Sequence, residues 1–230
     1  MSYNAHIDKN EISAMPTVAF EGRIITIDTP QAVDQAIIAL SKETSVGIDT
    51  ETRPSFRKGV QHDVSLIQLS TMDTCFLIRL NRTGIPASLV AFLENKEIAK
   101  IGLSLHDDYQ GLCKRRKFKA GNFIDLQKEV GKYGIEEMSL QKIYAIIFGE
   151  KISKSQQLTN WENSHLTPEQ ARYASTDAWA TLSIYLALQQ VKPLSKKAVE
   201  ALKRAEKEAQ IQRQQEALAK RQQENDNNQS

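Results

Sequence analysis

Short apolar runs, separated by polar turns and by stretches with helical spacing, make up most of the chain. Apolar runs of this length, rich in Val and Ile, predict buried strands. Six strands are expected, the third and fourth as a hairpin, at residues 23–27, 46–49, 64–69, 75–78, 98–103 and 122–126. Helices are expected at 87–93 and 107–116 and over most of the chain from Ser139 onward. Strands followed by alternating helices and strands predict a layered α/β sheet covered by helices.

Two helix starts carry explicit capping signals. Thr29-Pro30 fits an N-cap followed by proline at the first helical position, and apolar residues follow at helical spacing. Residues 167–170 (TPEQ) read as a capping box, again with proline at the first position. An apolar stripe at four-residue spacing, from Ala174 to Leu186, extends this second helix to about Gln190, near Pro193.

The same patterns divide the chain into three parts. Residues 1–19 have no periodic pattern and are expected to form a loose leader, and residues 20–192 are expected to form one domain. Residues 193–230 are rich in Lys, Arg, Glu and Gln, with few large apolar residues, and predict a solvated helix or a disordered tail. Basic pairs such as Lys203-Arg204 could instead contact phosphates.

Composition places few limits on function. The chain has 230 residues, a formal net charge of +2 and a pI near 8.4, which is compatible with a nucleic-acid partner without requiring one. Its polar start does not resemble a secretory signal, and no apolar run is long enough to span a bilayer. Cys75 and Cys113 offer neither zinc spacing nor a disulfide framework, so two ordinary thiols and a cytoplasmic location are expected.

Three segments carry candidate chemistry. Asp49 and Glu51 end a strand and point to one face, where two neighbouring carboxylates favour a divalent cation such as magnesium or manganese. Asp107-Asp108 stand where a strand meets a helix. Tyr173 and Asp177 stand one helical turn apart, which places both on one helix face. Taken singly, these could equally be a strand running into solvent, a helix cap and a hydrogen-bonded pair.

Taken together, the three segments resemble the DEDD family of 3'-5' exonucleases. The tyrosine in the third segment resembles the branch that includes RNase D and the exonuclease domain of the Werner syndrome protein. The resemblance covers roughly residues 20–190 and extends beyond the acids. The matching stretches are 65–69 (SLIQL), Lys154-Ser155, 158–161 (LTNW), 166–170 (LTPEQ), Tyr173-Ala174 and Asp177-Ala178.

This resemblance implies an RNase H-like α/β fold, with a mixed central sheet and helices on both faces. It also implies two-metal hydrolysis of DNA or RNA from single-stranded 3' ends, which releases nucleoside monophosphates, with Mg²⁺ or Mn²⁺ as the metal. The implied catalytic residues are Asp49, Glu51, Asp108, Tyr173 and Asp177, with the four acids as metal ligands.

The second motif requires a choice between adjacent aspartates. Family members have an apolar residue four positions after the metal-binding aspartate, and Leu112 stands at that spacing from Asp108, whereas Gly111 follows Asp107. Asp108 is therefore the expected ligand, with Asp107 left as a candidate helix cap and His106 without a catalytic role.

Three further residues are candidates for substrate binding. The backbone of Thr52 could contact the terminal nucleotide, Lys154 could contact a phosphate or be a solvated lysine, and Trp161 could stack on a base or pack its loop. Two other functions remain open: a non-catalytic nucleic-acid-binding module of the same fold, or an interaction protein that recruits partners through its charged tail. The presence of all four acids and the tyrosine favours the enzyme.

Overall fold

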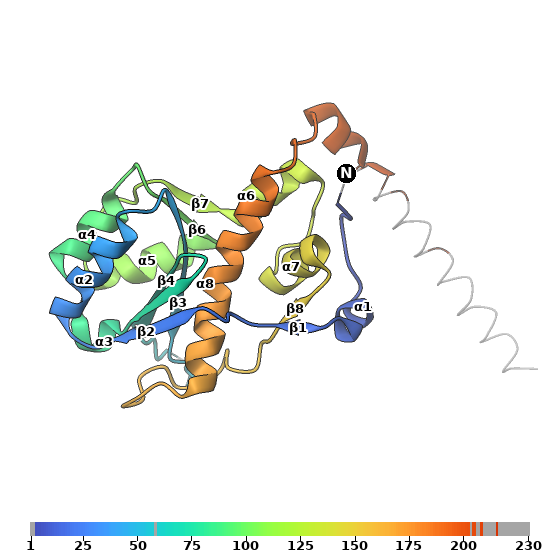
Figure 1. Cartoon of the computed structure of the whole chain (residues 1–230). Coiled ribbons are helices and arrows are strands. Elements are labelled where there is room, and N and C mark those ends of the chain that lie inside the picture. The colour runs from blue at the N-terminus through green and yellow to red at the C-terminus, as the bar shows by residue number, and fades with distance from the viewer. Residues whose placement is uncertain (1–2, 58, 203, 206–207, 209–214, 216–230) are drawn as a thin grey trace, which may run out of the picture.

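A six-stranded mixed sheet forms the centre of the molecule (Figure 1). The computed structural model describes residues 3–57, 59–202, 204–205, 208 and 215. In sheet order the strands are β2 (Arg23–Ile27), β5 (Thr74–Ile78), β4 (Val64–Ser70), β3 (Ser45–Thr52), β6 (Ala99–Gly102) and β7 (Phe123–Asp125). β4 runs antiparallel to both of its neighbours, and the other pairs are parallel. The six predicted strands and the hairpin of β4 and β5 are confirmed.

Helices cover both faces of this sheet. One apolar cluster joins alternate residues of β3 and β4, such as Ile48 and Ile67, to α2 (Pro30–Leu40), α3 (Leu80–Thr83), α4 (Ala87–Glu94) and α5 (Leu105–Arg115). On the other face, α8 (Pro168–Gln189) lies across the sheet, with α7 (Leu140–Phe148) beside it (Figure 1). The short helices α6 (Leu126–Glu129) and η1 (Val130–Tyr133) pack with α7 and α8. The predicted α/β architecture with helices on both faces is therefore confirmed.

Both predicted capping signals act as expected. The Thr29 hydroxyl accepts from the backbone N–H of Ala32 at the start of α2. At α8 the capping box is complete, because Thr167 and Gln170 accept from each other's backbone N–H groups. α8 is thus fixed at its N-terminal end, one turn before Tyr173.

The segment expected to be a loose leader is folded onto the domain over most of its length. It forms α1 (Lys9–Ala14) and β1 (Thr17–Val18), and β1 pairs in parallel with β8 (Lys151–Ile152). Ile7 and Ile12 are buried against Ala145 of α7. Apolar packing on a distant part of the chain, which leaves no local periodic pattern, explains why the sequence did not predict it.

The described part of the predicted tail begins against the domain. The Leu194 N–H donates to the Lys132 carbonyl at 2.9 Å, and residues 196–202 are helical. The prediction for residues 203, 206–207, 209–214 and 216–230 concerns residues outside those that the structure describes. Among the described helices, none combines the length and the apolar character that crossing a membrane requires.

Gly47 lets α8 approach the sheet closely. A Cβ atom at Gly47 would lie 1.8 Å from the carbonyl oxygen of Ala178. Gly47→Ala should therefore lower the free energy of unfolding by about 1–3 kcal/mol or more, because the helix must move off the strand. Denaturant unfolding would measure this loss. Gly131→Ala is the matched control, since a Cβ there meets nothing within 4 Å, and equal stability of the two variants would contradict the prediction.

Candidate active site

Three carboxylates converge where β3 meets α8. Asp49 and Glu51 are two residues apart on β3 and share a face with Gly47, against which α8 packs, and Asp177 comes from α8. One carboxylate oxygen from each of the three lies within 4.8 Å of the others. A close helix-to-strand approach thus brings together acids that are more than 120 positions apart in the sequence.

The close packing of these acids disfavours their charged forms. Burial raises the pKa of Asp49 well above its usual range, and the charges of Asp177 and Asp108 add to this shift. Burial likewise raises the pKa of Glu51 to about 10, with the charges of Asp49 and Asp177 as further causes. Carboxylates packed this closely are stabilised in their charged forms when a bound cation balances their negative charge.

Tyr173 and Lys154 complete the cavity around the carboxylates. Its volume is about 310 Å³, and its lining includes Asp49, Glu51, Lys154, Tyr173 and Asp177. Burial raises the pKa of Asp177 to about 7, while the Tyr173 phenol and Lys154 act in the opposite direction. Burial, and then the charges of Asp177 and Glu51, raise the pKa of Tyr173 well above its ordinary value. The phenol therefore keeps its proton while the carboxylates are charged.

Asp108 lies close to this group but outside it. α5 begins at Leu105, two residues earlier than predicted, and its N-cap is Ser104, which has a φ of 58° and makes no side-chain capping bond. Asp107 stands inside the first turn, so the expectation that it might cap the helix is wrong. The Asp108 carboxylate accepts a hydrogen bond from the Thr50 hydroxyl, and burial raises its pKa to about 6.

Thr50 is the site residue that sequence reasoning missed. It stands between Asp49 and Glu51, so its side chain leaves the opposite face of β3 and reaches α5. The alternation of the DTE triplet was the available signal, because the middle residue of such a triplet must face the helix on the other side. Thr50 thus links the Asp108 helix to the strand that carries the other two acids.

The two other predicted residues, Thr52 and Trp161, do not line the carboxylate cavity. Thr52 ends β3 and lines a neighbouring hollow of about 500 Å³ together with Asp108. Trp161 is fully buried, and its ring centroid lies 6.1 Å from that of Tyr173. A fully buried indole offers no face to a base, so the stacking hypothesis for Trp161 is wrong and the packing alternative fits its position.

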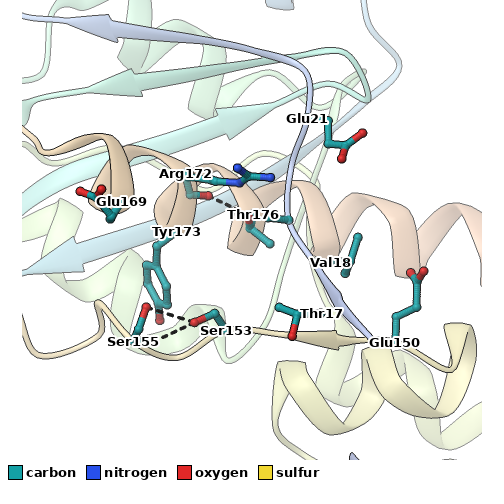
Figure 2. Close-up of a pocket in the computed structure, with 11 residues that line it drawn as sticks. Thr17, Val18, Glu21, Glu150, Ser153, Ser155, Glu169, Arg172, Tyr173 and Thr176 are labelled. Carbon is teal, nitrogen blue, oxygen red and sulfur yellow. Dashed lines mark hydrogen bonds between the residues drawn. The ribbon is translucent and has the colours of Figure 1, made fainter. Parts of the chain in front are cut away.

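A further hollow, of about 530 Å³, adjoins the site at Tyr173 (Figure 2). Figure 2 shows the Tyr173 ring extending toward Ser153 and Ser155. It also shows the N-terminal segment that carries Thr17 and Val18 passing in front of α8. The charged residues around this hollow are Glu21, Glu150, Glu169 and Arg172. Three carboxylates against one guanidinium make it electrostatically unfavourable for a polyanion.

This fold and its acidic site define a class of nuclease domain. A 3'-5' exonuclease family model matches residues 24–192. The chain belongs to this family of 3'-5' exonucleases, and its RNase H-like fold agrees with the prediction. The matched range contains every predicted site residue.

Individual relatives agree with this assignment. The mouse bifunctional 3'-5' exonuclease/ATP-dependent helicase WRN is 29% identical over 84% of this chain, which spans only 14% of that protein. An Arabidopsis thaliana 3'-5' exonuclease is 28% identical over 76% of the chain and 67% of its own length. The Aedes aegypti Nibbler EXO domain superposes with a TM-score of 0.68 at 22% identity, covering 80% of this chain and 99% of that one. The last likeness concerns the fold alone.

Proposed function

We propose that this protein is a metal-dependent 3'-5' exonuclease that removes nucleoside monophosphates from single-stranded 3' ends of DNA or RNA. The observation that carries the proposal is the convergence of Asp49, Glu51 and Asp177 within 4.8 Å inside a cavity that Tyr173 also lines. Membership of the 3'-5' exonuclease family, and similarity to the mouse and Arabidopsis 3'-5' exonucleases, support the direction of cleavage.

The donor set fits Mg²⁺ or Mn²⁺. It consists of hard carboxylate oxygens, without the imidazole or thiolate ligands that softer metals prefer. Asp49, Glu51 and Asp177 would hold one cation, and Asp108 would help to hold a second. Two such cations supply charge stabilisation to the attacking and leaving oxygens of a phosphodiester.

Three further residues would position the reactants. Because its pKa is raised, Tyr173 is better suited to orient the attacking water through its phenol than to remove a proton. Lys154 is exposed and lines the cavity, and it would contact a phosphate of the substrate. Thr52, beside Glu51 at the end of β3, would contact the terminal nucleotide through its backbone.

A gel assay tests this function. A 5'-labelled single-stranded DNA and a matching RNA are incubated with magnesium, with manganese or with EDTA, beside Asp49→Ala. The expected result is a metal-dependent ladder that shortens from the 3' end and is absent with the variant. Binding of either polymer without any ladder would instead support a non-catalytic module, and the preferred polymer would be read from the same gel.

Tyr173→Phe tests the positioning role of the phenol. The variant should lower kcat by about 10–100-fold and leave KM nearly unchanged, because a misplaced water slows only the chemical step. The pH dependence of kcat should keep its shape. If Tyr173 removed the proton instead, the rate of the unaltered protein would rise with pH as the phenol ionises, and this rise would be absent from the variant. Tyr185→Phe, on the same helix but outside the cavity lining, is the matched control.

A further inference from the structure

The loop between the two central strands of the site exposes apolar side chains. It covers residues 53–63, all described except residue 58, and connects the end of β3 to the start of β4. Phe56 is 84% exposed, the largest exposed fraction among the large apolar side chains that the structure describes, and Val60 is 44% exposed. The loop leaves the sheet two residues after Glu51, so its first residues start next to the strand end that carries the carboxylates.

The charges on this loop suit a polyanion. A hollow of about 380 Å³ is lined by Arg53, Pro54, Ser55, Phe56, Arg57, Val60 and His62, and no carboxylate of the described residues lines it. Glu162 pairs with Arg53 at 3.2 Å and lies 4.0 Å from His62, whereas Arg57 makes no ion pair with any residue that the structure describes. This sets the loop hollow apart from the one beside Tyr173, which three glutamates line.

The loop hollow is connected to the active site through shared residues. His62 lines both the loop hollow and the hollow of about 500 Å³ that contains Thr52 and Lys114. Thr50 lines that second hollow and also the cavity of the three carboxylates. The three hollows thus adjoin in series from the carboxylates, past the Asp108 helix, to Phe56, and this series is called the track. Asp63, Asp107 and Asp108 line its middle hollow, so the loop is its basic end.

We propose that the loop of residues 53–63 binds the single strand upstream of the cleaved bond, with Phe56 stacking on a base and Arg57 contacting a phosphate. This inference rests on the proposed function and adds a binding surface to it. An exposed aromatic ring stacks on any base, and arginines follow the sugar-phosphate backbone, so this pair of contacts suits single strands without sequence preference. The same surface holds the strand while its end is removed one nucleotide at a time.

The test compares a long and a short substrate. Binding of a fluorescently labelled thymidine oligomer that spans the track is measured by anisotropy in EDTA, so that no cleavage occurs. Hydrolysis of the p-nitrophenyl ester of thymidine 5'-monophosphate, which is too short to reach the loop, measures the carboxylate site separately. The variants are Phe56→Ala, Phe56→Trp and Arg57→Gln. Ile38→Ala, an exposed apolar residue on α2, is the matched control.

The expected result is a selective loss for the long substrate. Phe56→Ala should weaken oligomer binding on the order of tenfold. Phe56→Trp should bind the oligomer about as tightly as the unaltered protein, because stacking requires an aromatic ring. Arg57→Gln should weaken binding and reduce its dependence on salt. Unchanged oligomer binding in Phe56→Ala would overturn the proposal and leave a protein partner as the occupant of this surface.

Two other outcomes have distinct meanings. An equal loss of oligomer binding and ester hydrolysis in Phe56→Ala would also overturn the proposal, because the change would then act through the carboxylate site. If the unaltered protein hydrolyses neither this ester nor the oligonucleotides of the gel assay, the proposed enzyme function fails, and the anisotropy of the variants still decides whether the loop binds a strand.

Discussion

Asp177→Asn is expected to lower the rate of cleavage by about 10³-fold or more, because the variant loses several kcal/mol of charge stabilisation and each 1.36 kcal/mol is tenfold in rate. Asparagine keeps the size of the side chain but removes the third negative charge from the group. The measurement is single-turnover cleavage of a 5'-labelled oligonucleotide in saturating magnesium. Folding should persist, since burial of the Asp177 carboxylate and its repulsion of Asp49 and Glu51 raise the free energy of the metal-free protein.

A matched control and a second readout make this result specific. Asp73→Asn changes an exposed aspartate outside the lining of the carboxylate cavity and should cleave at the unaltered rate. Magnesium affinity, followed by calorimetry, should fall in Asp177→Asn and not in the control. Near-normal cleavage by Asp177→Asn would mean that the carboxylate group is not the catalytic centre.

The local half of this site could be predicted from the sequence. Alternation along a strand places Asp49 and Glu51 on one face, and the capping box at Thr167 fixes the helix on which Tyr173 and Asp177 share a side. These signals depend on residues close together in the chain. The family resemblance then linked the two halves, which no local pattern could do.

What the sequence did not predict depends on contacts between distant segments. The close approach of α8 to Gly47 decides that Asp177 reaches Asp49, and it is visible only in three dimensions. The start of α5 was misplaced because the acidic pair resembled a helix cap, whereas Ser104 makes the turn with a left-handed backbone. The indole of Trp161 was an open choice, since burial cannot be read from a loop sequence.

The metal-free protein should become less stable as pH rises, and magnesium should reverse much of that loss. The folded-state pKa values of Glu51 and Asp177 are raised to about 10 and about 7, so the folded state binds more protons than the unfolded state above about pH 4. Stability is therefore greatest near the unfolded pKa values and falls as pH rises toward the folded ones. Magnesium binds the charged carboxylates, so its stabilising effect should grow with pH.

Thermal unfolding from about pH 5.5 to about pH 8.5, with magnesium or EDTA, measures this linkage. At a hundredfold excess over its Kd, magnesium should add about 2.7 kcal/mol, or roughly 5–10 °C in Tm for a chain of this size. Glu51→Gln should unfold at a higher temperature than the unaltered protein in EDTA at the alkaline end and gain little from magnesium. A Tm in EDTA that does not change with pH would contradict the prediction. Charging the three carboxylates would then cost no more free energy in the folded state than in the unfolded state. Glu51→Gln thus separates the two roles of the group, since the charge that lowers the stability of the metal-free protein is the same charge that binds the cation.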